Sequence, residues 1–208
     1  MKHILFLVVF LVSLPVYGQT AQDSFDPHTW EAPYHLPTPT GWNTERFLIP
    51  INFAPQISYQ GVEDIRFSPG WAKRTSDEYW TYAFLWYLDK LPETNAGIIA
   101  GNLKAYYAGL VKSNTDSAKA ATTKVIPVTT SFKKSRTEKG DRETYTGTVN
   151  MTDYMQRQPI TLNCIVHVKS CKGGKSILFY ELSPKSFTHP NWINLNQLWL
   201  DFTCEKSR

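Results

Sequence analysis

Residues 176–182, which read SILFYEL, constrain the fold more strongly than any other segment of the chain. A strand with this sequence carries apolar side chains on both of its faces. Strands that are buried on both faces are usually central in a sheet and covered on both sides. The segment therefore predicts a sheet in which this strand lies inside and a layer of structure covers each face.

The segments before it favour further strands of the same sheet. From residue 124 onward the hydrophobic pattern has a period of two, which is typical of strands. The strands expected from this pattern cover residues 124–133, 143–151, 160–169 and 176–182, with the turn KGGK at 172–175. Earlier in the chain, residues 47–53 and 62–67 are also expected to be strands, and Pro50 makes the first an edge strand or an irregular one.

Two segments have the period of an amphipathic helix. The first covers residues 94–112 and begins with Thr94, a plausible N-cap. The second covers residues 190–202 and begins with Pro190. Glycines 97, 101 and 109 weaken the first helix and are expected to mark close packing against a sheet. Residues 78–89 fit either a helix or a strand, and their aromatic content favours a long strand.

This order of elements predicts the fold class. Consecutive strands joined by short turns build an antiparallel sheet, and two amphipathic helices can cover its faces. We therefore expect a single α+β domain, mainly an antiparallel β-sheet flanked by two helices, over residues 42–208. The element order resembles the plan of the PsbP and Mog1 class of domains. The resemblance implies the arrangement of sheet and helices, and it assigns no function or residue.

The N-terminus has the pattern of a secretory signal peptide. Lys2 precedes an uncharged apolar run of about 13 residues, which is shorter than the roughly 20 that a membrane-spanning helix needs. Cleavage is expected after Gly18, so that residues 1–18 are removed. Residues 19–41 are rich in proline and are expected to form an extended arm that Trp30 and Tyr34 attach to the domain.

Three cysteines are compatible with one disulfide. Cys164 lies on the apolar side of the strand 160–169, where a free thiol behaves as a small hydrophobic group. Cys171 and Cys204 follow the ends of expected elements, where a crosslink does not disturb packing. We predict a disulfide between Cys171 and Cys204, and three free thiols remain the alternative. His167 is expected to face away from Cys164, which argues against a catalytic pair.

Composition and motifs narrow the possible functions. The chain is 42% hydrophobic and 19% charged, which is typical of a globular protein and argues against intrinsic disorder. Its formal charge of +4 is too small to predict a nucleic-acid partner. The sequence lacks the nucleophile-elbow, zinc-protease, P-loop and dinucleotide-binding motifs. We therefore expect no catalytic residue, no cofactor and no metal ion.

Aromatic and acidic residues in the N-terminal half give the candidate site. A possible ligand platform combines tryptophans with nearby carboxylates: Trp42, Trp71, Trp80, Glu45 and Glu78. Exposed rings can form a ligand- or protein-binding surface, although most such rings pack in cores. Adjacent acids such as Asp77 and Glu78 are usually solvated, but carboxylates beside rings also occur in glycosidase clefts.

These observations predict an exported binding protein. We expect a non-catalytic domain that binds a small ligand or an envelope protein, with no transmembrane segment after cleavage. One alternative is a secreted hydrolase that uses the carboxylates between Glu45 and Glu78. Two carboxylates that converge in a deep pocket would favour this hydrolase. A structural envelope component without a ligand is the other alternative.

Overall fold

The chain folds around one antiparallel sheet. The computed structural model describes residues 25–115, 125–138 and 140–206. Within them, seven strands form a sheet in the order β1-β2-β3-β7-β6-β5-β4, and all neighbouring strands are antiparallel. The strands are β1 (Asn43–Ile49), β2 (Gly61–Phe67), β3 (Tyr82–Leu88), β4 (Thr129–Lys134), β5 (Glu143–Asp153), β6 (Gln158–Ser170) and β7 (Ser176–Ser183). The predicted α+β class is confirmed.

Two meanders meet in the middle of this sheet. Strands β1, β2 and β3 run from one edge inward, whereas β4, β5, β6 and β7 run inward from the other edge. Helix α1 (Ala96–Asn114) connects the end of the first meander to the start of the second. Strand β7 pairs with both β3 and β6, which confirms the central position predicted from its apolar faces.

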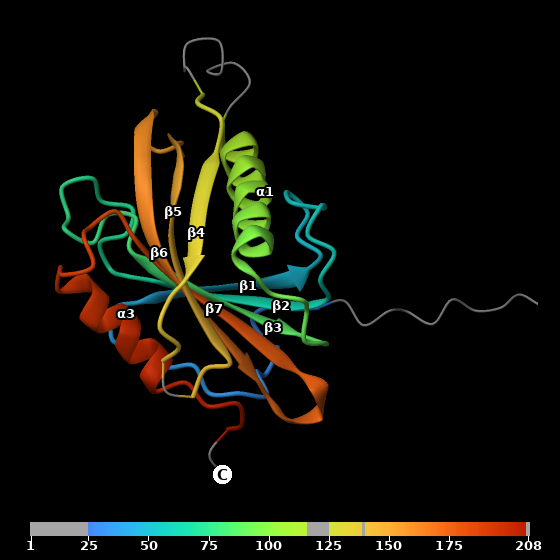
Figure 1. Cartoon of the computed structure of the whole chain (residues 1–208). Helices are drawn as coiled ribbons and strands as arrows, with labels where there is room; N and C mark the ends of the chain where they lie inside the picture. The colour runs from blue at the N-terminus through green and yellow to red at the C-terminus, as the bar shows by residue number, and fades with distance from the viewer. Residues whose placement is uncertain (1–24, 116–124, 139, 207–208) are drawn as a thin grey trace, which may run out of the picture.

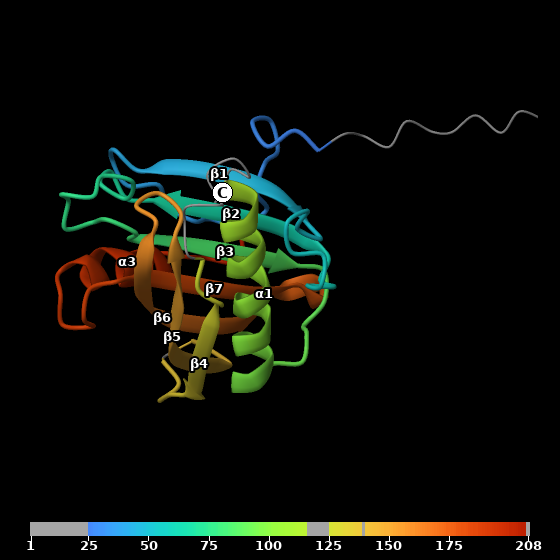
Figure 2. The same cartoon turned by 90° about the horizontal axis from the view of Figure 1, so that it is seen from above.

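Each face of the sheet is covered by one helix. Helix α1 lies on one face, and helix α3 (Asn191–Leu200) lies on the other (Figures 1 and 2). Figure 1 also shows that β4, β5 and β6 run across the direction of β1, β2 and β3, as expected for a strongly twisted sheet. Along β3, Phe84 and Trp86 enter the core beneath α1, and Ala83 and Leu85 enter the core beneath α3.

Several predicted boundaries are wrong by a few residues. Strand β1 is an edge strand, as predicted, but it lies at Asn43–Ile49 and ends before the cis peptide bond between Ile49 and Pro50. The strand predicted at 78–89 begins only at Tyr82, because Trp80 has a positive φ of 55° that interrupts extended backbone. Strand β4 begins at Thr129 and is shorter than predicted.

The N-cap of α1 is Asn95 and not Thr94. The Asn95 side chain accepts a hydrogen bond from the backbone N–H of Ile98 at 2.9 Å. Both residue types are good caps, so propensity does not separate them. Thr94 instead donates a hydrogen bond to Glu143 on β5, at 2.6 Å. A tertiary contact therefore sets where this helix begins.

The N-terminal arm and the C-terminal segment pair beneath α3. His35 and Thr203 exchange backbone hydrogen bonds of 3.0 Å, and Tyr34 is buried. Cys171 and Cys204 form the predicted disulfide, with a Cα–Cα distance of 5.6 Å. Cys164 is buried in the core beneath α1. His167 stacks on Trp199 of α3, so it faces away from Cys164 as predicted.

The expected signal peptide, residues 1–18, lies outside the described residues, as does the start of the arm. No helix in the described ranges is long and apolar enough to cross a membrane.

Only one of the three glycines of α1 meets a crowded environment. A Cβ atom added to Gly109 would lie 1.8 Å from the backbone oxygen of Phe53, in the loop after β1. A Cβ atom added to Gly101 would meet nothing within 4 Å. Close packing therefore explains Gly109, and the neighbour is this loop and not the sheet.

The two glycines give a matched test of this contact. Gly109→Ala should lower the free energy of unfolding by roughly 1–3 kcal/mol, because helix and loop must separate. Gly101→Ala should raise it by about 0.5–1 kcal/mol, because alanine favours the exposed helix. Urea denaturation followed by circular dichroism measures both values. Equal changes for the two variants would contradict the described approach of α1 to Phe53.

Candidate functional site

A pocket of about 350 Å³ opens between the second half of α1 and the sheet. Its volume is at the lower end of the roughly 300–1,000 Å³ typical of small-molecule sites. Eight aromatic rings line it, together with two aliphatic and two polar side chains. The lining residues are Glu45, Phe47, Phe53, Ile65, Phe67, Trp71, Trp80, Tyr82, Tyr106, Leu110, Asn114 and Tyr154. We call this the aromatic pocket.

Several rings of the pocket pack against one another edge to face. The rings of Trp71 and Trp80 lie 6.3 Å apart at 89°, and those of Trp80 and Tyr154 lie 5.2 Å apart at 74°. Phe67 stacks on Trp71 with a centroid distance of 4.3 Å. Trp80 is buried, whereas Phe67, Trp71 and Tyr154 are partly exposed. The pocket therefore has a buried base and an accessible rim.

Trp80 is held in an unusual conformation at this site. Its positive φ of 55° is a clear outlier for a bulky residue. Its backbone N–H donates to the carbonyl of Trp71 at 2.8 Å, which fixes the loop between β2 and β3. Such backbone strain often occurs at functional sites, where the surrounding structure maintains it.

A buried carboxyl group lies behind the pocket wall. Glu63 is fully buried on β2 and accepts hydrogen bonds from the Tyr106 hydroxyl at 2.7 Å and the Trp86 indole N–H at 2.9 Å. Burial raises the pKa of Glu63 to about 8, although both hydrogen bonds oppose the shift. The nearby charge of Glu45 raises this pKa further. Glu63 is therefore largely protonated at neutral pH.

The structure brings together three of the five residues of the expected ligand platform. Glu45, Trp71 and Trp80 line the aromatic pocket. Trp42 packs with the core beneath α3, on the opposite face of the sheet. Glu78 accepts a hydrogen bond from the backbone N–H of Gly70 at 2.8 Å and stabilises the loop between β2 and β3. These two residues do not belong to the pocket.

The carboxylates considered for a hydrolase are dispersed. Glu45 lines the aromatic pocket, and Glu63 is buried behind it. Asp77 is exposed and pairs with Lys185 at 2.7 Å. Asp64 alternates with Glu63 along β2 and faces the other side of the sheet. Two carboxylates therefore do not converge in the pocket.

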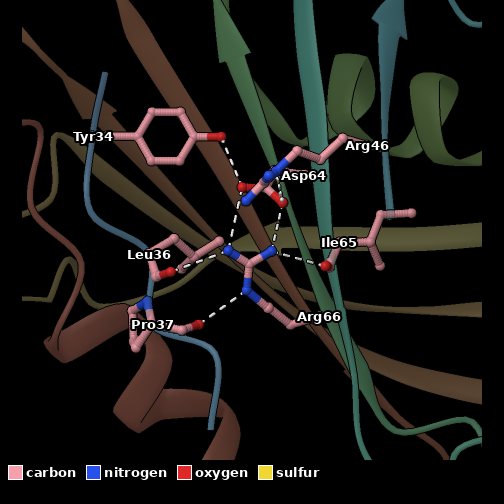
Figure 3. A network of polar contacts seen from close by, with 7 residues as sticks. All are labelled: Tyr34, Leu36, Pro37, Arg46, Asp64, Ile65 and Arg66. Carbon is pink, nitrogen blue, oxygen red and sulfur yellow. Dashed lines mark hydrogen bonds and ion pairs between the residues drawn. The ribbon is translucent and has the colours of Figure 1, made fainter. Parts of the chain in front are cut away.

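Asp64 belongs to a buried network that attaches the arm to the sheet (Figure 3). Its carboxylate accepts hydrogen bonds from the Tyr34 hydroxyl and from Arg46, both at 3.0 Å, and from Arg66 at 2.5 Å. Arg66 is buried and also donates to the backbone carbonyls of Leu36 and Pro37 at 3.0 Å. Arg66 also donates to the Ile65 carbonyl, so every N–H group of its guanidinium has an acceptor. These contacts favour a role in holding the arm on the sheet.

A second buried cluster lies between β6 and α3. His167 contacts Asp141 through Nδ1 at 2.7 Å and Glu181 through Nε2 at 3.2 Å. These two acids raise the pKa of His167 to about 9 against the opposing effect of burial. Trp199 donates to Asp141 at 3.0 Å. One imidazolium faces two acids, and burial raises the pKa of Glu181, which favours a proton on that acid and a single ion pair between His167 and Asp141. The contacts of this cluster with Trp199 favour a role in holding α3 on the sheet.

Sequence reasoning missed several wall residues of the pocket. Phe47, Phe53 and Phe67 read as ordinary strand and loop residues, and Tyr106 reads as the buried face of a helix. The alternation along β1 places Phe47 on the same face as Glu45, and this signal was available in the sequence. The contribution of Tyr154, from the turn between β5 and β6, requires the paired sheet.

Metal ligands do not gather in the part of the chain that the structure describes. No group of three or more His, Cys, Asp or Glu residues there could hold a metal ion. Comparisons with known proteins find no match: no family model fits the chain, and no curated protein or solved structure is significantly similar.

Glu63 predicts a specific pH dependence of stability. In the unfolded chain the pKa of this group should be near its ordinary value of 4.5, whereas burial in the fold raises the pKa to about 8. Its contribution to stability is therefore complete below pH 4.5 and is lost as the pH rises to about 8. Within that window, one proton changes the free energy of unfolding by about 1.4 kcal/mol per pH unit.

The variant Glu63→Gln should remove this part of the decline. Urea denaturation at several pH values between 5 and 8.5 measures it, as the difference between the wild type and the variant. Glu93→Gln, at an exposed position before α1, is the matched control and should follow the wild type. A Glu63→Gln curve parallel to that of the wild type would show that the carboxyl ionises at the same pH in both states.

Proposed function

We propose that this protein is an exported, non-catalytic binding protein of the cell envelope that holds a small ligand in the aromatic pocket. The observation that carries the proposal is the pocket itself, where eight rings surround about 350 Å³. Contact between water and such apolar walls is unfavourable. An apolar ligand surface that displaces this water would therefore bind favourably. The strained Trp80 at its base supports the same interpretation.

The arrangement of acids favours binding over hydrolysis. Hydrolysis of a glycosidic bond needs two carboxyl groups on opposite sides of the bond. Of the described carboxylates, Glu45 is the one that lines the pocket. Glu63 is buried behind the wall, where its carboxyl oxygens accept hydrogen bonds from Tyr106 and Trp86. A bound molecule would therefore meet a single exposed carboxylate beside aromatic walls.

Export is supported by two independent features. Residues 1–18 have the charge and length pattern of a secretory signal peptide. The disulfide between Cys171 and Cys204 is the kind of bond that persists in an oxidising compartment. It joins the turn after β6 to the segment after α3, and so stabilises the layer that covers one face of the sheet.

We expect the natural protein to begin at Gln19. Edman degradation or mass spectrometry of protein purified from its own cells should show loss of residues 1–18, and the mass should rise by two hydrogens on reduction of the disulfide. Protein that retains Met1 and occurs in the cytoplasmic fraction would contradict export. This result would leave the proposed ligand pocket untouched, because the pocket uses none of these residues.

The pocket itself is tested with an uncharged fluorescent probe. N-phenyl-1-naphthylamine should bind with a rise in its fluorescence, and Leu110→Trp should reduce this rise at least fivefold by filling the pocket. Leu200→Trp, on the exposed side of α3, is the control and should bind as the wild type does. Asn114→Trp, at the rim of the pocket, is a second blocking variant in case Leu110→Trp folds poorly. Equal binding by the blocked and control variants would refute the pocket as the site.

A further inference from the structure

We propose that the ligand of the aromatic pocket is a small organic cation that carries a quaternary or methylated ammonium group. This inference rests on the proposed function, since it names the class of molecule that the same pocket takes. It is argued from the rings, the charge and the size of the pocket.

The rings provide the first argument. Eight aromatic rings line the pocket, and those of Trp71 and Tyr154 are partly exposed. Aromatic faces carry negative partial charge and attract cations that lie within about 6 Å of the ring centre. Several rings around one space can surround a methylated ammonium group, whose methyl groups also benefit from an apolar surface.

The charge of the lining residues provides the second argument. Glu45 is the one charged side chain among the described residues that line the pocket. Its neighbour Arg46 points to the other face of the sheet, where it donates to Asp64 at 3.0 Å and lies over the ring of Trp30. An anionic ligand would be repelled by Glu45, and a cation would be attracted to it.

Glu45 also differs from the other acids near it because its carboxylate can contact a ligand. Glu63 is enclosed by two hydrogen bonds, and Asp153 accepts hydrogen bonds from the Tyr79 hydroxyl and the backbone of Met155. Glu45 is exposed at the edge strand, next to the partly exposed rings of Phe47 and Phe67. It therefore supplies a free negative charge at the rim.

The volume of the pocket limits the ligand to a small molecule. A volume of about 350 Å³ accommodates an ammonium group with one short substituent better than a long chain. In the larger hollow between the arm and β1, of about 1200 Å³, the charged side chains already have partners: Lys175 pairs with Asp89 at 2.6 Å, and Glu31 pairs with Lys206 at 3.4 Å. The aromatic pocket is therefore the better site for a cation.

The test compares two molecules of nearly the same shape. Choline chloride carries the charge, and 3,3-dimethylbutan-1-ol is its neutral carbon analogue. Titration of the disulfide-bonded protein, followed by NMR line shapes of the methyl groups, gives both dissociation constants. We expect choline to bind about tenfold more tightly than the neutral analogue.

Variants then locate the interaction. Glu45→Gln should weaken choline binding about three- to tenfold and leave the neutral analogue unchanged. Trp71→Leu should weaken choline binding through loss of a ring wall. Trp42→Leu, on the opposite face of the sheet, and Glu93→Gln are the matched controls and should bind as the wild type does.

The outcomes separate the two proposals. Equal affinity for choline and its neutral analogue would overturn the cation while the pocket remains a binding site. A preference for choline that Glu45→Gln and Trp71→Leu both leave unchanged would place the cation outside the aromatic pocket and would overturn the proposal too. Failure of choline to bind at millimolar concentration would also overturn it. If the naphthylamine probe then also fails to bind, the proposed function is wrong as well.

Discussion

Burial of both faces of the central strands is the constraint on which the rest of this structure depends. Strands β3 and β7 are apolar on both sides, so each side must be covered before the sheet is stable in water. Helix α1 covers one side, and α3 together with the N-terminal arm covers the other. The order of the strands follows from this need, because the two meanders meet where burial is greatest and leave the more exposed strands β1 and β4 at the edges.

The two sides are held in different ways. On the face covered by α3 and the arm, charged groups are buried in contact with one another, as in the network of Asp64 and Arg66 (Figure 3) and in the separate cluster around His167. Breaking such a network is costly because it leaves a buried charge without a partner, so these contacts fix the arm and α3 in one position. Beneath α1, rings carry the packing, and large flat side chains from several elements leave a space where they do not interlock.

This difference explains why the candidate site lies beneath α1. The aromatic pocket lies between the second half of α1, the end of β2 and the start of β3, and the loop with the strained Trp80 closes its base. Glu45 at the rim provides a charge that no partner in the lining compensates, whereas Glu63 behind the wall keeps its proton through burial. A positively charged ligand would contact Glu45 and would leave the buried Glu63 undisturbed.

The sequence by itself predicted most element types, the central position of β7, the covering of both faces and the disulfide between Cys171 and Cys204, but it left residues 78–89 between helix and strand. These features follow from local periodicity and from which residues end an element, and both are written along the chain. Only the tertiary structure decided that α1 begins at Asn95, that Trp80 interrupts the expected long strand, and that Trp42 lies apart from Trp71 and Trp80. Each of these depends on contacts between residues far apart in the sequence, such as Thr94 with Glu143. The pocket belongs to this second group, because its rings come from four separate stretches of the chain, at 47–53, 67–82, 106 and 154, and no local pattern shows which rings will share a space.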